Sequence, residues 1–263
     1  MEIKERDVDL ASVSIPGSVE SIGIYAFNGC ESLENLTLSE GLKTIEGGAF
    51  MGCPITSLVI PNSVTTINTY VYSTTYSTYY DGAFENCEKL TSVTIGDRLT
   101  GIEREAFRAC SALTAVTIGA RMQTIGEYAF AYCTSLKEID MGGTTVISNY
   151  CFYGCTSLEN VTVGAYVTKI GDYAFSNCIN LASVNIPGSV ESIGIYAFNG
   201  CESLENLTLN EGLRTIEGGA FMGCPITSLV IPNSVTTINT YVYSSTYSTY
   251  YDGASLPPRQ ECL

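Results

Sequence analysis

Histidine and tryptophan are absent from the 263-residue sequence, and basic residues are few, 12 against 27 acidic residues. Without histidine, the chain lacks the side chain that most often serves as a general base or metal ligand near neutral pH. With a net charge of −15, it also lacks the positive surface that attracts nucleic acids and anionic membranes. These absences argue against histidine-based catalysis and against a nucleic-acid partner.

Long apolar runs and the usual catalytic signatures are missing as well. No hydrophobic stretch is long enough to cross a bilayer, and residues 2–7 are charged where a signal peptide would turn apolar. The sequence contains no glycine-rich phosphate loop, nucleophile elbow or dinucleotide fingerprint. We therefore expect a non-enzymatic chain with no catalytic residue, cofactor, metal or direct membrane insertion. A cytoplasmic location and a place within a longer exported protein both stay open.

A short repeated unit dominates what is present. An Ala-Phe pair recurs every 23 residues, with one interval of 22 and one of 34, and each phenylalanine is followed three residues later by cysteine and then by an L-x-x-V-x-I run. A unit this short cannot bury its own apolar side chains, so the pattern predicts a solenoid of stacked units. The phenylalanines are Phe27, Phe50, Phe84, Phe107, Phe130, Phe152, Phe175, Phe198 and Phe221.

Each unit predicts the same small elements. The alternating L-x-x-V-x-I run, which occurs ten times from Leu10 onward, predicts a short strand. The Ala-Phe segment predicts a helical or 3₁₀ turn. The predicted fold is thus an α/β-type repeat solenoid of about ten coils. It has one parallel sheet on a concave face, short helical or 3₁₀ turns, and short strands elsewhere.

The unit resembles the 23-residue class of BspA-like leucine-rich repeats, which reads I-G-x-x-A-F-x-x-C-x-x-L-x-x-V-x-I-P. The stretch from Ile170 to Pro187 matches every position that this pattern defines, and the resemblance covers residues 10–254. Characterised members look like surface proteins, and several are implicated in adhesion to host matrix proteins. The resemblance therefore implies a leucine-rich repeat fold and a cell-surface or secreted protein.

Cysteine placement indicates free thiols rather than disulfides. Nine of the eleven cysteines occupy one position of successive units, where their side chains should point inward in parallel and behave as small buried apolar groups. Cys151 replaces the alanine of the Ala-Phe pair and is expected to be buried too. Cys262 is the one thiol expected to be exposed.

A longer duplication overlies the short repeat. Residues 15–83 recur as residues 186–254, and the tail 255–263 matches no repeat. We divide the chain into an N-terminal arm (1–9), a solenoid (10–254) and the tail (255–263). A solenoid that stopped at the tail would leave an apolar end open, which hints at truncation or end-to-end contact. The copies differ at Ser39/Asn210, Lys43/Arg214 and Thr74/Ser245.

The strongest candidate for a binding surface is a tyrosine-rich insertion. Residues 69–80 and 240–251 interrupt the repeat and hold ten of the 18 tyrosines. Tyrosine among serine and threonine is typical of antibody loops, and the high β-propensity of these residues also favours a hairpin. A hairpin that merely packs on the solenoid is the alternative. The candidate residues are Tyr70, Tyr72, Tyr76, Tyr79, Tyr80, Tyr241, Tyr243, Tyr247, Tyr250 and Tyr251.

The concave sheet face is a second candidate. Its outward positions are small, hydroxyl-rich and almost uncharged, and threonine and serine also simply suit parallel strands. Because large aromatic and arginine anchors are lacking there, this face is the weaker candidate. Its residues are Asn35, Thr37, Ser92, Thr94, Thr117, Glu138, Asp140, Asn160, Thr162, Asn206 and Thr208.

Two functions follow as hypotheses. The first is a recognition module that binds a protein or glycan in the manner of an adhesin, through the tyrosine loops and the concave face, with host matrix among the candidate partners. The second is a structural protein that self-associates end to end or through the tyrosine loops into a larger assembly. The resemblance favours the first hypothesis and the duplication favours the second.

Overall fold

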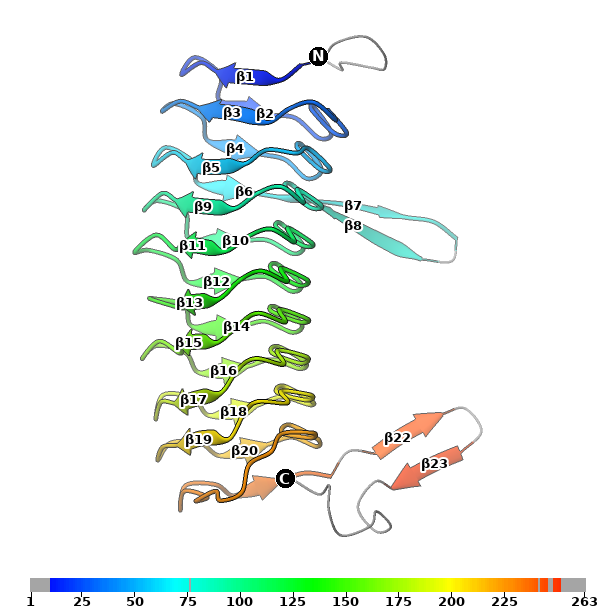
Figure 1. Cartoon of the computed structure of the whole chain (residues 1–263), viewed down its shortest axis with the longest axis vertical. Helices are drawn as coiled ribbons and strands as arrows, with labels where there is room; N and C mark the ends of the chain where they lie inside the picture. The colour runs from blue at the N-terminus through cyan, green and yellow to red at the C-terminus, as the bar shows by residue number, and fades with distance from the viewer. Residues whose placement is uncertain (1–9, 76, 241, 246–247, 252–263) are drawn as a thin grey trace.

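The computed structural model describes residues 10–75, 77–240, 242–245 and 248–251. Within these ranges the chain forms strands and turns and no helix. Ten coils stack in one column, with the N-terminal coil at one end (Figure 1). The prediction of a ten-coil solenoid is confirmed, whereas its α/β class is wrong for the residues described.

The L-x-x-V-x-I runs form the long-strand stack. Its strands pair in parallel and in register within four short sheets, as Val13 does with Leu36. Their alternation points an apolar residue inward at every second position, and the outward residues are mostly polar, with Val59 an exception. The tenth run, 226–231, carries no assigned strand. The members are β1 (Ser12–Ile15), β3 (Asn35–Leu38), β5 (Ser57–Ile60), β9 (Ser92–Ile95), β11 (Ala115–Thr117), β13 (Glu138–Asp140), β15 (Asn160–Thr162), β17 (Ser183–Ile186) and β19 (Asn206–Leu209).

A second parallel stack of two-residue strands lines another side of the column, and we call it the short-strand stack (Figure 1). In nearly every coil the second residue of the strand is a buried isoleucine, so this side also contributes to the core. The predicted short strands elsewhere are confirmed. The members are β2 (Ser21–Ile22), β4 (Thr44–Ile45), β6 (Thr66–Ile67), β10 (Gly101–Ile102), β12 (Thr124–Ile125), β14 (Val146–Ile147), β16 (Lys169–Ile170), β18 (Ser192–Ile193), β20 (Thr215–Ile216) and β21 (Thr237–Ile238).

The segment around each Ala-Phe pair, which we call the Ala-Phe turn, is not the predicted helical or 3₁₀ turn. In a helix every interior N–H bonds within the segment, but here alternate N–H groups bond to the next coil. The N–H groups of Tyr173 and Phe175 donate to the carbonyls of Ile195 and Ala197 at 2.8 and 2.7 Å. The intervening N–H groups bond within the turn: Ala174 donates to Gly171 at 3.4 Å and Ser176 to Tyr173 at 3.1 Å. The turn is therefore shared between coils.

Left-handed residues on both sides of the phenylalanine enforce this path. In the turn around Phe175, Tyr173 has φ 56° and Asn177 has φ 61°, and a left-handed residue ends a right-handed helix. Other coils place glycine at the second of these positions, for example Gly154 with φ 71°, where the conformation carries no steric cost. The repeat thus interrupts the helix before it can form one complete turn.

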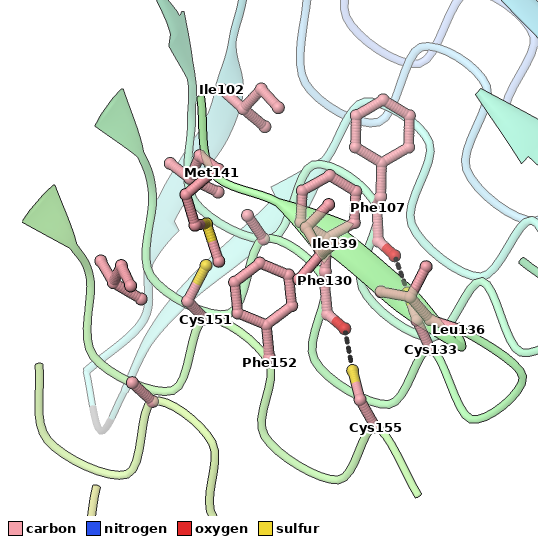
Figure 2. Packing of buried hydrophobic residues seen from close by; sticks show 14 of the residues in the cluster. Ile102, Phe107, Phe130, Cys133, Leu136, Ile139, Met141, Cys151, Phe152 and Cys155 are labelled. Atoms are coloured by element: carbon pink, nitrogen blue, oxygen red, sulfur yellow. Dashed lines mark hydrogen bonds between the residues drawn. The ribbon is translucent and has the colours of Figure 1, made fainter. Parts of the chain in front are cut away.

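Phenylalanine and cysteine form continuous ladders inside the column. Neighbouring rings from Phe27 to Phe221 stack with centroids 5.1–5.6 Å apart. Each ladder cysteine from Cys53 onward donates its S–H to the phenylalanine carbonyl of the preceding coil, as Cys155 does to Phe130 at 3.2 Å (Figure 2). All ten described cysteines are free thiols, and Cys151 is fully buried. The expectation for Cys262 lies outside the described residues.

The first tyrosine insertion is an antiparallel hairpin, β7 (Thr69–Ser73) with β8 (Thr78–Gly82). It projects from the side of the column that carries the Ala-Phe turns (Figure 1). The second insertion pairs β22 (Val242–Ser245) with β23 (Ser248–Tyr251). The predicted hairpin conformation is confirmed in both.

The buried thiols should be chemically silent in the native protein. Burial raises the pKa of Cys53 and of Cys155 to about 12, so the reactive thiolate is scarce at pH 8. With Ellman's reagent at pH 8, we expect no more than two thiols to react fast, namely half-buried Cys30 and Cys262. After denaturation, all eleven cysteines should react. Fast reaction of the ladder cysteines from Cys53 to Cys201 in the native state would contradict the packing.

Replacing Ala109 with glycine should stabilise the folded protein, because Ala109 is a non-glycine residue at φ 58°. A residue with a Cβ in the left-handed backbone region carries steric strain of about 1–2 kcal/mol, which glycine avoids. This gain exceeds the backbone entropy that glycine loses on folding, about 0.5–1 kcal/mol. We expect Ala109→Gly to raise the free energy of unfolding by about 0.5–1 kcal/mol in urea denaturation. Ala115→Gly, within β11, is the matched control and should lower it.

Candidate functional site

The β7–β8 hairpin is held at its base by coils on both sides. One face carries Tyr70, Tyr72, Tyr79 and Asp81, because opposite residues of an antiparallel pair share a face. The Tyr72 and Tyr79 rings stack at 5.0 Å, and Tyr70 lies 5.9 Å from Tyr72. Tyr25, from the first coil, meets Tyr70 edge-on at 5.3 Å and donates its hydroxyl to Asp81. This contact fixes the direction in which the hairpin leaves the column.

Two glycines of the second coil make this approach possible. A Cβ on Gly47 would lie 1.8 Å from the backbone nitrogen of Tyr70, and a Cβ on Gly48 would lie 2.3 Å from the Tyr25 ring. Any side chain there would displace the hairpin or the ring. The Gly-Gly pair before Phe50 therefore serves the hairpin as well as the repeat.

The other hairpin face rests on the fourth coil. The guanidinium of Arg104 lies 4.0 Å from the Tyr80 ring centroid and 5.0 Å from that of Tyr128, so it is held between two aromatic faces. The same guanidinium pairs with Glu105 at 3.1 Å and with Glu127. Arg104 thereby links the hairpin to the fourth and fifth coils.

An ion pair between half-buried Arg108 and buried Glu85 closes the base of β8. Arg108 bonds Glu85 at 2.6 Å, and the second carboxylate oxygen of Glu85 accepts the Gly82 N–H at 3.3 Å. Burial raises the pKa of Glu85, although Arg108 acts in the opposite direction. Arg108 also lies 5.5 Å from the Tyr132 ring centroid. The pair orients the start of the next coil against the hairpin.

These side chains line an open hollow of about 530 Å³ beside β8, and we call it the hairpin groove. Tyr79 and Tyr132 are its most exposed rings, at 45% and 41%. Burial and the neighbouring Tyr150 raise the pKa of Tyr128 to about 12, so its phenol stays neutral at physiological pH. Tyrosine and arginine are the residues that most often anchor protein interfaces. The lining residues are Thr78, Tyr79, Tyr80, Asp81, Glu85, Arg104, Glu105, Arg108, Tyr128 and Tyr132.

The predicted tyrosines are distributed unequally over this site. Tyr79 and Tyr80 line the groove, whereas Tyr70 and Tyr72 do not line it and instead stack with Tyr79 along one hairpin face. Tyr243, Tyr250 and Tyr251 lie in β22 and β23, but their side chains are outside what the structure describes. Tyr76, Tyr241 and Tyr247 lie outside the described residues altogether.

The predicted sheet-face residues lie in rows on the outer surface of the long-strand stack. Glu138 pairs with Asn160 and Asp140 with Thr162 across β13 and β15. All of them are exposed except Ser92, which is half-buried. None of these residues lines the hollow beside β8.

Of the groove residues, sequence reasoning named only Tyr79 and Tyr80 as candidates. It missed Asp81, Glu85, Arg104, Glu105, Arg108, Tyr128 and Tyr132. A signal was available, because Arg104 and Arg108 bracket Phe107 in the first full unit after the insertion, in a chain with only 12 basic residues. Stacking then brings the same positions of adjacent units together. Within the described ranges there is no cluster suited to a metal ion, and no helix there could span a membrane.

The chain belongs to the BspA-type leucine-rich repeat family. The family description "BspA type Leucine rich repeat region" matches in six copies, over residues 5–80, 74–178 and 142–249. These ranges cover nearly the whole chain, so the expected resemblance is confirmed. The search of curated proteins found no match.

Solved structures of leucine-rich repeat proteins are similar to this chain. One from Eubacterium ventriosum is 18% identical with a TM-score of 0.50, covering 91% of this chain and 87% of that one. One from Bacteroides ovatus is 24% identical, with a TM-score of 0.41 and coverage of 88% and 84%. A leucine-rich cell surface protein from Faecalibacterium prausnitzii is 21% identical, with a TM-score of 0.35 and coverage of 88% and 79%.

Removing the Arg104 side chain should weaken the docking of the hairpin against the column. Arg104→Ala eliminates both aromatic contacts and the pair with Glu127, a loss of about 1 kcal/mol in docking energy. We expect about fivefold faster chymotryptic cleavage at Tyr72 and Tyr79, because proteolysis follows the population of the open form. Mass spectrometry of limited digests measures this. Arg121→Ala, at an exposed arginine, is the control and should leave the rate unchanged.

Proposed function

We propose that this chain is a non-enzymatic recognition module that binds a protein or glycan ligand through the hairpin groove. The observation that carries the proposal is the groove itself, where two arginines and exposed tyrosine rings converge beside a rigidly docked hairpin. Membership in a repeat family built for stacking supports a scaffold role, since solenoids present extended surfaces for binding.

Preorganisation supports binding at this hairpin over a mere packing role. Tyr25, Arg104 and Glu85 contact the hairpin or its base from three different coils. A ligand therefore meets a groove whose walls are already ordered, and the entropic cost of binding is reduced. The exposed rings of Tyr79 and Tyr132 at the rim of the groove remain accessible for contact.

The proposal places the protein at a cell surface or outside the cell, in the manner of an adhesin. The outer face of the long-strand stack would extend the contact for a large ligand, since its serine, threonine and asparagine side chains are exposed. That face provides hydrogen-bond partners without aromatic anchors, so its share of the binding energy would be small.

Binding should depend on Tyr132 and not on tyrosines elsewhere. On a panel of immobilised extracellular matrix proteins and a glycan array, we expect wild-type binding to at least one component. Tyr132→Ala should weaken that binding at least about tenfold, the size of a hot-spot loss. Tyr166→Ala removes a ring that is 67% exposed outside the groove, and it should bind like wild type.

A second measurement distinguishes self-association from ligand binding. Light scattering over a concentration series gives the molar mass of the wild type and of a variant with both tyrosine insertions replaced by glycine and serine. A mass that grows with concentration in the wild type alone would favour an assembly protein. Binding that is equal in the wild type and in Tyr132→Ala would remove the groove from the account.

A further inference from the structure

The outer edge of β8 borders the hairpin groove, and its backbone pattern can be worked out from the register. Thr74 lies opposite Ser77 and donates its N–H to the Ser77 carbonyl at 2.8 Å, so this is a hydrogen-bonded pair. Hydrogen-bonded and non-hydrogen-bonded pairs alternate along an antiparallel ladder. The pairs of Thr78, Tyr80 and Gly82 are therefore of the second kind, and their N–H and C=O groups point away from β7.

The contacts of Gly82 agree with this pattern. Its N–H donates outward to Glu85 at 3.3 Å, and its carbonyl accepts the Gly48 N–H at 3.2 Å. Both outward groups of Gly82 are thus satisfied by the coils. For Thr78 and Tyr80, the described residues provide no partner for the outward backbone groups. Both of these residues also line the hairpin groove, so two residues of free strand edge belong to its wall.

We propose that the hairpin groove binds an extended polypeptide that adds a strand to the outer edge of β8. This inference rests on the proposed function and specifies its ligand class. Donors and acceptors that alternate along a strand, repeating at about 6.8 Å, match another peptide backbone. A glycan has hydroxyl groups but no such register. Glu85, which already caps Gly82, marks the end of the added strand.

Charge favours basic side chains in that peptide. The groove contains Asp81, Glu85 and Glu105, and its two guanidiniums are already paired with carboxylates. The chain as a whole carries −15, which steers cations toward it. The exposed faces of Tyr79 and Tyr132 can hold a lysine or arginine through cation–π contact. We expect Lys or Arg at alternate positions, among β-favouring residues.

Two proline variants test strand addition directly. Thr78→Pro removes an N–H that points into the groove and that the hairpin ladder does not use, a position where an edge strand tolerates proline. Ser73 lies directly opposite Thr78 and the two hydroxyls are 3.1 Å apart. Ser73→Pro therefore removes the equivalent N–H from the far edge of β7 and disturbs the hairpin equally.

The probe is a random eight-residue peptide library displayed on phage and selected against the whole chain. We expect selected peptides with alternating basic residues, a loss of affinity of about tenfold in Thr78→Pro, and a change below about twofold in Ser73→Pro. Limited chymotrypsin digestion checks that both variants keep the hairpin docked. On binding, the amides of Thr78 and Tyr80 should become protected from hydrogen exchange, while that of Val71 should not.

Three outcomes would overturn strand addition. These are a library that yields no groove-dependent peptide, equal losses in the two proline variants, and binding without protection of Thr78 and Tyr80. Glycan binding that is lost in Tyr132→Ala but unchanged in Thr78→Pro would reject the peptide mode while leaving the recognition function intact. If neither Tyr132→Ala nor Thr78→Pro weakens binding, both strand addition and recognition through the groove are rejected.

Discussion

The structure depends on one interaction above all, the hydrogen bonds that alternate N–H groups of each Ala-Phe turn donate to the next coil. Because Tyr173 and Phe175 bond to Ile195 and Ala197, consecutive turns must follow the same path at the same height. That constraint places phenylalanine over phenylalanine and brings the S–H of each ladder cysteine from Cys53 onward to the phenylalanine carbonyl of the preceding coil. It also explains why the left-handed positions recur on both sides of the phenylalanine.

The same constraint decides where the chain can carry an added element. An insertion within the strands would break the register of two stacks, whereas the segment between β6 and the Ala-Phe turn can lengthen outward. The first hairpin emerges there and returns to the column before Ala83 and Phe84, which are fully buried. The neighbouring coils carry residues that accommodate the hairpin. Gly47 and Gly48 leave room for it on one side, and Arg104 contacts it on the other. The groove is thus a consequence of fitting a hairpin into a rigid stack.

The sequence was sufficient for the coil number, the long strands, the buried cysteines and the hairpin, because each depends on a pattern that repeats or on local β-propensity. The helical turn was wrong, since Ala-Phe next to polar residues favours a helix locally and only the neighbouring coil supplies the competing hydrogen bonds. A single unit such as 170–187 contains no sign of those bonds. Their trace is the spacing of Gly154 and Gly200 relative to the phenylalanines, visible only on comparing units.

Only the hairpin side of the groove was predictable, for a similar reason. Tyr79 and Tyr80 stand out in composition, but Arg104 and Tyr128 lie 24 and 48 residues beyond Tyr80 in the sequence, and only coil stacking brings them together. The ligand does not follow from either pattern, because recognition depends on which polar groups remain unpaired after the hairpin docks. Backbone groups at Thr78 and Tyr80 can be identified as such only once the hairpin register is known.

Native-state amide hydrogen exchange tests the shared turns most directly. The account predicts that the amides of Phe107, Phe130 and Phe175, which donate to the next coil at 2.9, 3.0 and 2.7 Å, exchange as slowly as the amides of the long-strand stack. They should open only when whole coils separate. Exchange at these three positions as fast as in exposed loops would contradict the account, because the coils would then be joined by their strands alone.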